Sequence, residues 1–292
     1  SGQIYNLYAQ DEHRLSDKFK VVGGLHFNYY SYTTGRVMPK GALIWSPYRG
    51  GTYKAIVSRG FRSPTFYELT FTDGSLYAGN PDLKPELITS YDIITSHEFP
   101  YGFFVDVAYN YSEITDLIQQ AYIDISDPSH PGGSFPAEVF QFRNSGDQIT
   151  NSFELGLRRS PVYRLSGFAN ITYQNLHVCN HEGSETSFNS PKWLGNLGLT
   201  YQLMEGKLIA SAKVQYVGAR AMWDETWMDE AIVTDMYLRS GALFKGVKAT
   251  VGVKNLFDTK YAVPISPDYA PSVSIDRPGR SLYLNFRTTT NW

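Results

Sequence analysis

Apolar residues occupy every second position along much of this chain. The alternation is clear in residues 23–30, 103–111, 208–216, 247–254 and 282–292, where Asn, Gln, Ser, Thr, Lys and Gly fill many of the positions between. A period of two is typical of a β-strand with two unlike faces. No comparable helical period occurs. One short exception is predicted at residues 63–69, where Ser-Pro precedes a Glu at capping distance.

The pattern predicts thirteen strands. They run at 2–12, 18–32, 38–47, 52–60, 86–98, 102–115, 139–159, 163–177, 192–203, 207–221, 233–244, 247–257 and 279–291. Tight turns between them alternate with longer irregular links, at 60–88, 116–138, 178–191, 222–232 and 257–278. This alternation is typical of an up-and-down meander with short turns at one rim and long loops at the other.

These strands suit a membrane better than a soluble sandwich. One face is polar, as in a wet lumen, and several strands are long enough for a tilted crossing of about 9–11 residues. Aromatic rings gather near strand ends, where they meet the membrane–water boundary: Tyr29, Tyr30, Tyr109, Tyr111, Tyr173 and Tyr216. We therefore predict an all-β fold, the antiparallel portion of a transmembrane β-barrel. A soluble all-β architecture such as a propeller is the alternative.

The strand number predicts that the chain is a piece of something longer. Bacterial single-chain barrels have even strand numbers, so thirteen strands indicate that strands are missing from the front. The chain also opens in strand-like fashion at Ser1, without an initiator Met. We expect a mature or truncated portion of a larger protein.

Composition excludes several classes of protein. The chain is 15% aromatic but only 18% charged, and its formal net charge of −2 shows no basic excess, so no nucleic-acid partner is expected. The single cysteine, Cys179, excludes an internal disulfide. The chain contains no run of about 18 apolar residues, the length that would indicate a membrane helix. No nucleophile elbow, zinc-protease motif or phosphate loop is present, so neither an enzyme nor a cofactor is expected.

The most specific motif lies around residues 59–86. It reads Arg59-Gly60-Phe61-Arg62-Ser63-Pro64-Thr65-Phe66-Tyr67-Glu68-Leu69, followed by Gly79-Asn80-Pro81-Asp82-Leu83-Lys84-Pro85-Glu86. Further segments are Tyr8-Ala9-Gln10-Asp11-Glu12, Gly24-Leu25-His26-Phe27, Asn255-Leu256-Phe257-Asp258-Thr259-Lys260-Tyr261 and Arg277-Pro278-Gly279-Arg280. In these segments and their order the whole chain resembles the TonB-dependent outer-membrane receptor family, with His26 where that family usually has Arg.

Most motif residues also have a purely structural interpretation. Proline cannot donate to a strand ladder, so Pro64, Pro81 and Pro85 are expected to end strands and shape loops. Arg59, Arg62 and Glu68 are expected to pair where the strand leaves the membrane. Asn255 and Asp258 are expected to bond nearby backbone groups. We expect this set mainly to shape loops and rims rather than to contact a ligand.

The resemblance implies a bacterial outer-membrane barrel of 22 strands around an N-terminal plug, with residues 1–292 as the C-terminal portion and the plug and coupling box absent. It implies energised uptake of a scarce, bulky nutrient, either an iron–siderophore or a cobalamin-type corrinoid. The energy would come from the TonB–ExbB–ExbD system through the missing N-terminal region. Trp292, in phase with Phe286 and Leu284, resembles the signal read by the barrel assembly machinery. A passive porin-like channel is the alternative function.

Candidate ligand contacts lie in the long loops. Aromatic side chains there suit an apolar or aromatic chelate: Phe61, Phe66, Tyr67, Phe71, Tyr77, Trp223 and Trp227. A metal site is not expected. His177, Cys179 and His181 share a face at period two but have no second ligand cluster, and are expected on a loop. No spacing supports a calcium site among the acidic loop residues Asp124, Asp127, Asp224, Glu225, Asp229 and Glu230.

Overall fold

The computed structural model describes residues 2–73, 76–124, 138–162, 164–180, 183–186, 188–222, 224–242, 246–265 and 274–288. Five residues named above lie outside these ranges: Ser1, Asp127, His181, Trp223 and Trp292. Within them, no helix is long and apolar enough to cross a bilayer.

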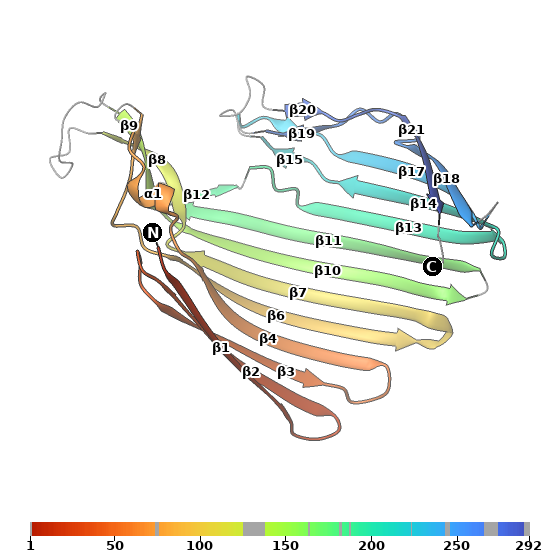
Figure 1. Ribbon diagram of the computed structural model, residues 1–292, viewed down its shortest axis with the longest axis horizontal. Helices are drawn as coiled ribbons and strands as arrows, with labels where there is room; N and C mark the ends of the chain where they lie inside the picture. The colour runs from red at the N-terminus through yellow and green to blue at the C-terminus, as the bar shows by residue number, and fades with distance from the viewer. Residues whose placement is uncertain are drawn as a thin grey trace.

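One antiparallel sheet dominates the described part of the chain, and thirteen strands follow one another in it in chain order (Figure 1). They are β1 (Ile4–Arg14), β2 (Phe19–Tyr30), β3 (Arg36–Trp45), β4 (Gly51–Arg62), β6 (Glu86–Phe99), β7 (Phe103–Thr115), β10 (Asp147–Val162), β11 (Leu165–Asn180), β13 (Trp193–Met204), β14 (Leu208–Val217), β17 (Ala231–Ser240), β18 (Val247–Lys254) and β21 (Ser281–Thr288). The predicted meander is confirmed.

Short elements fill the long connections. They are α1 (Phe66–Thr70), β5 (Tyr77–Ala78), β8 (Ile118–Asp124), β9 (Glu138–Asn144), β12 (Gly183–Thr186), β15 (Arg220–Ala221), β16 (Trp227–Met228), β19 (Ala262–Pro264) and β20 (Ser274–Asp276), with a 3₁₀ turn η1 (Pro100–Gly102) in a tight connection. Figure 1 shows α1, β8 and β9 gathered at one end of the sheet and the tight hairpin turns at the other. We call these ends the loop rim and the turn rim.

The prediction of one strand over 139–159 is wrong. The chain bends at Ser145 and Gly146, where Gly146 has φ 105°, a conformation that glycine adopts without strain. Residues before the bend form β9, which pairs with β8 and β5 in a separate small sheet, and residues after it form β10. Several long links therefore carry short strands of their own.

The main sheet exposes its apolar face. In β2 the accessible and half-covered residues alternate along the whole strand, and the accessible set holds Leu25, 55% exposed, and Phe27. The half-covered set holds Lys20, His26 and Asn28. Cross-strand register extends the apolar rows over many strands, for example Leu199, Ala212, Met236, Val253 and Leu282. We call this apolar side the outer face and the opposite side the inner face.

The fully buried apolar residues in the described ranges lie mainly at the loop rim, not behind the sheet. Leu69, Leu83 and Ile118 form one cluster, and Ala78, Ile123 and Val139 form another. A soluble sandwich would bury the apolar rows of its sheet in a shared core. An apolar face that remains bare is the arrangement that lipid requires.

Aromatic rings border the apolar band of the outer face. Toward the turn rim, Phe19, Trp45 and Tyr53 stack side by side, with ring centroids 5.8 and 5.2 Å apart. Toward the loop rim, Tyr173 meets Trp193 at 4.8 Å. Two aromatic levels around an apolar band are typical of the two membrane–water boundaries.

Candidate functional site

The segment that leaves β4 begins with a capped helical turn. Thr65 is the N-cap of α1 and accepts a hydrogen bond from the backbone N–H of Glu68, while the Glu68 carboxylate accepts from the backbone N–H of Thr65 at 2.6 Å. This reciprocal capping box satisfies two donors that a helix start leaves open. The predicted short helix is confirmed.

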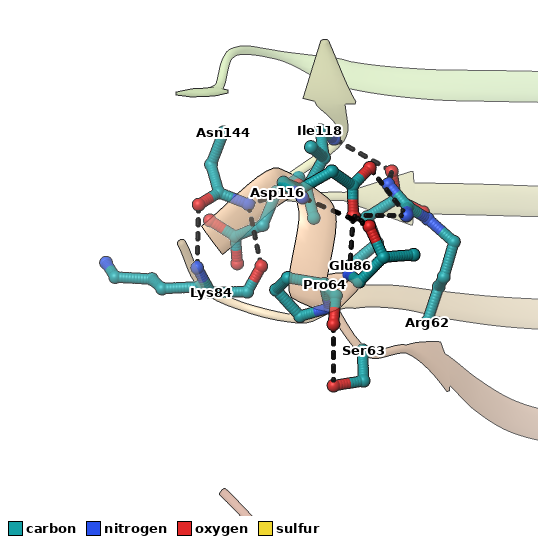
Figure 2. A network of polar contacts seen from close by, with 10 residues as sticks. Arg62, Ser63, Pro64, Lys84, Glu86, Asp116, Ile118 and Asn144 are labelled. Carbon is teal, nitrogen blue, oxygen red and sulfur yellow. Dashed lines mark hydrogen bonds and ion pairs between the residues drawn. The ribbon is translucent and has the colours of Figure 1, made fainter. Parts of the chain in front are cut away.

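Arg62 joins four elements at the loop rim (Figure 2). Its Nη1 donates to both carboxylate oxygens of Glu68 at 3.0 and 3.1 Å, and its Nε and Nη2 donate to Glu86 at 2.7 and 2.9 Å. Glu86 also accepts from the backbone N–H of Ile118 at 2.8 Å. The end of β4, α1, the start of β6 and the start of β8 are thereby held together.

Electrostatics agree with this geometry at the strand ends, beyond the apolar band. Burial opposes ionisation of Glu86, but the hydrogen bonds from Arg62 and from the Ile118 backbone prevail and lower the pKa of its carboxyl. The hydrogen bond to Glu86 raises the pKa of the Arg62 guanidinium. Arg62 and Glu68 thus pair as expected, whereas Arg59 has no ion pair among the described residues and lies in the outer-face register of Val57.

The second half of the motif docks on the loop that follows β7. Asn80 donates to the backbone carbonyl of Phe142 at 2.8 Å. Asn144 accepts from the backbone N–H of Lys84 at 2.8 Å and donates to the carbonyls of Lys84 and Asp116 at 2.9 and 2.7 Å. Asn144 was missed by sequence reasoning, because its partner lies 60 residues away.

The motif at 255–261 shapes the turn after β18. Asn255 and Asp258 both have positive φ, 49° and 53°. The Asn255 side chain donates to the Thr259 carbonyl and accepts from the Thr259 N–H, each at 2.9 Å. Asp258 accepts from the Arg280 backbone N–H at 2.7 Å. The expectation that these side chains bond nearby backbone groups is confirmed for Asn255, whereas the backbone partner of Asp258 lies 22 residues further along the chain.

Three of the candidate ligand residues meet in one aromatic cluster at the loop rim. The rings of Tyr67 and Phe71 stack at 4.5 Å, and Phe71 lies 6.2 Å from Tyr77. Two rings of β9, Phe140 and Phe142, extend the cluster by contacts with Tyr77 and Tyr67 at 5.6 and 6.2 Å. We call these five residues the rim aromatic cluster. Sequence reasoning missed the two β9 members.

The other candidate aromatics lie elsewhere. Phe61 packs edge-on against Tyr30 at 5.9 Å. Phe66 is 67% exposed and has no ring contact among the described residues. Trp227 belongs to β16, which pairs with β15 in a separate two-stranded sheet.

A pocket of 410 Å³ lies on the inner face near the loop rim, between β14, β17 and the short strands β15 and β19. Its lining includes Arg220, Arg277, Asp229 and Tyr261. Arg220 is only 9% exposed, and its Nε has no hydrogen-bond partner in the described part of the chain. Burial lowers the pKa of Arg220. No described carboxylate lies within ion-pair distance of either arginine, and the two guanidinium groups outnumber Asp229, the carboxylate in the lining, so the side chains around the pocket carry a net positive charge.

Metal-binding geometry is not found in the described ranges, where no three His, Cys, Asp or Glu side chains form a group that could hold an ion. His177 and Cys179 were expected on a loop, but they lie in β11, and a ring nitrogen of His177 shares a hydrogen bond with Asn175 at 2.8 Å. β11 extends three residues past its predicted end because it pairs there with β12.

Comparison with known proteins agrees with the fold. A family model described as TonB dependent receptor-like, beta-barrel, matches residues 1–256. The ferric enterobactin receptor of Pseudomonas aeruginosa is 22% identical over 320 residues, which cover 98% of this chain and 42% of that receptor. The vitamin B12 transporter BtuB of Photobacterium profundum is 36% identical over 98 residues, 34% of this chain and 15% of the transporter.

Solved structures show the same architecture. The ferric-catecholate import receptor Fiu from E. coli K12 superposes with a TM-score of 0.77 at 16% identity, over 97% of this chain and 44% of Fiu. The chain spans 37–42% of the length of the curated relatives that it matches along most of its own length. Because the family model covers most of the chain and the sheet has the matching fold, the chain belongs to the TonB-dependent receptor family of outer-membrane β-barrel proteins.

Proposed function

We propose that this chain is the C-terminal portion of the barrel of a receptor that imports a scarce, bulky nutrient across the outer membrane. The ligand is an iron–siderophore or a cobalamin-type corrinoid. Strands supplied by the rest of the protein complete a 22-stranded ring around a plug, and the TonB–ExbB–ExbD system energises passage by acting on the N-terminal part of the receptor.

The membership of the family carries this proposal, and the sheet supports it. An apolar outer face, a polar inner face and long loops at one rim suit a wide barrel that encloses an aqueous path. A lumen of that width cannot be filled by its own side chains, so a plug is needed to seal it. The match to a ferric enterobactin receptor and to a B12 transporter supports the ligand classes.

Two features at the loop rim suit such a ligand. The rim aromatic cluster offers ring faces, of which Tyr67 is 48% and Phe71 40% exposed, to an apolar or aromatic chelate. The inner-face pocket adds two guanidinium groups without a carboxylate partner, which attract an anionic complex. A ferric catecholate combines aromatic rings with negative charge and therefore fits both features better than a corrinoid does.

Ligand titration of the complete protein tests the proposal. Ferric enterobactin and cyanocobalamin are added separately, and binding is followed by quenching of protein fluorescence. We expect saturable binding of one of them, weakened about tenfold by Tyr67→Ala, since an aromatic contact of this size is worth roughly 1–1.5 kcal/mol. Tyr101→Ala is the control, because Tyr101 is an even more exposed tyrosine, 76% against 48% for Tyr67, and lies at the opposite, turn rim.

A passive channel would behave differently. It would bind neither ligand saturably and would conduct ions at a steady level in a planar bilayer. That combination of results would overturn the proposed receptor function, whereas saturable binding with a closed bilayer recording supports it.

A further inference from the structure

A groove on the outer face lies close to the turn rim. It runs along β11, where Gly167 and Ala169 occupy successive outer-face positions, and the Leu199 side chain leans over Gly167, with Cδ2 2.8 Å from where a Cβ of that residue would stand. Register places Leu157 and Leu197 on either side of Ala169, and Arg159 and Leu199 on either side of Gly167. The groove has a volume of 210 Å³, and its lining is apolar apart from Arg159 and Ser166: Phe103, Leu157, Arg159, Leu165, Ser166, Gly167, Phe168, Ala169, Leu197 and Leu199.

Arg159 is the only charged residue in this part of the outer face. In the described halves of β10, β11 and β13 that lie toward the turn rim, the other outer-face positions hold Leu, Ala, Gly, Ile and Tyr. The Arg159 guanidinium lies 5.1 Å from the centroid of the Phe103 ring, and its Nε is buried with no hydrogen-bond partner among the residues that the structure describes. No described carboxylate pairs with it.

A cation on a lipid-facing surface is costly unless it meets an anion. The cost of an exposed arginine is about 2–4 kcal/mol at the bilayer centre and falls toward zero near the interface, where the side chain can reach a headgroup. Arg159 lies three residues before Val162, which pairs with Leu165 at the tight β10–β11 turn. Short turns mark the periplasmic rim of such barrels.

We propose that this groove is a binding site for one anionic glycerophospholipid of the periplasmic leaflet. An acyl chain lies over Ala169, between Leu157 and Leu197 and beside Leu199, and the lipid phosphate accepts hydrogen bonds from the Arg159 guanidinium. The lipid phosphate thereby supplies an anionic partner for Arg159, which has no carboxylate partner in the described part of the protein.

Arg158 provides an internal control for the charge. It is adjacent in sequence but lies on the inner face, where its guanidinium sits 4.7 Å from the centroid of the Phe104 ring. Arg158 and Arg159 therefore share residue type, depth and a phenylalanine neighbour, and they differ in the face of the sheet that they occupy.

Native mass spectrometry of the complete protein tests the proposal. The protein is stripped of lipid in neutral detergent and incubated with phosphatidylglycerol or, separately, phosphatidylethanolamine. We expect one retained phosphatidylglycerol per protein and at least fivefold less retained phosphatidylethanolamine. Arg159→Gln should reduce retention of phosphatidylglycerol about tenfold, and Arg158→Gln should leave it unchanged.

A second variant separates the groove from the charge. Ala169→Leu keeps Arg159 but fills the groove with an apolar side chain, so retention should fall about as far as in Arg159→Gln. Folding of each variant is checked by its heat-modifiable migration on a denaturing gel. Equal retention of phosphatidylglycerol by the Arg158 and Arg159 variants would overturn the proposal, as would equal retention of both lipids by the unmodified protein. In either case Arg159 would only contact the Phe103 ring, and the surrounding lipid would be bound without selectivity.

Discussion

Replacing Ile93 by arginine tests whether the bare apolar face contacts lipid. Ile93 lies in the middle of β6 on the outer face, where it is 63% exposed and has Ala55 and Tyr109 as cross-strand neighbours. Ile94 follows it at the same depth on the inner face, between Lys54 and Ala108. The two isoleucines are thus a matched pair that differs in the medium each side chain meets.

The expected costs differ because the two media differ. Arginine near the midplane of a lipid-facing strand costs about 2–4 kcal/mol of the free energy of unfolding, which is roughly a 30- to 700-fold change in the folding equilibrium. Ile94→Arg places a cation in a wet lumen, where the main penalty is the neighbouring Lys54, roughly 0.2–1 kcal/mol. Equilibrium unfolding of the complete protein in phospholipid vesicles, with urea as denaturant, measures both.

Equal costs for the two variants would refute the assignment of faces. A larger cost for Ile94→Arg would point to a sheet whose inner face is packed and whose outer face is wet. Val251 and Thr250 in β18 offer a second pair on opposite faces, and Val251→Arg should cost about 2–4 kcal/mol while Thr250→Arg should cost much less.

Three further outcomes are expected. Arg62→Leu leaves two buried carboxylates unpaired and should cost about 2–4 kcal/mol, somewhat less than a fully buried pair because the Arg62 side chain is 39% exposed; urea unfolding measures it. The lowered pKa of Glu86 contributes stability that is fully present above the ordinary carboxyl value of 4.5 and is lost as the pH falls through the lower folded value. The urea midpoint should therefore fall, as the pH is lowered below 4.5, more steeply in the unmodified protein than in Glu86→Gln. Asn255→Ala removes two hydrogen bonds at φ 49° and should cost about 1–3 kcal/mol, whereas an unchanged melting temperature would contradict the role of this turn.

Local features were predictable because their causes lie within a few residues. Alternation of polar and apolar positions is a property of each strand alone, so it determined the strands, and the short turns between them determined their antiparallel order. The helical turn at α1 follows from Thr65 and Glu68, three positions apart. The bonds between Asn255 and Thr259 were predictable for the same reason, whereas the bond that Asp258 accepts from the Arg280 backbone spans 22 residues.

Other features depended on which strands meet. Residues 139–144 alternate like a strand that continues into the next, and only pairing with β8 separates them from β10. The aromatic residues of that segment then join Tyr67 and Tyr77, from which they are more than 60 residues distant. The sequence could not indicate this contact, because no local pattern encodes the docking of one loop on another.

The sequence by itself determined that this chain forms two-faced strands in an up-and-down order. The polar–apolar alternation of a strand and the turn residues that follow it depend only on neighbouring residues. Only the tertiary structure decided which charged side chains lie beside aromatic rings and beside the outer-face groove. The pair Arg158-Arg159 is visible in the sequence, but register with β7 and β11 places one residue beside Phe104 and the other beside Phe103 and Gly167. Such neighbours are set by hydrogen bonds between strands, and those depend on the whole sheet.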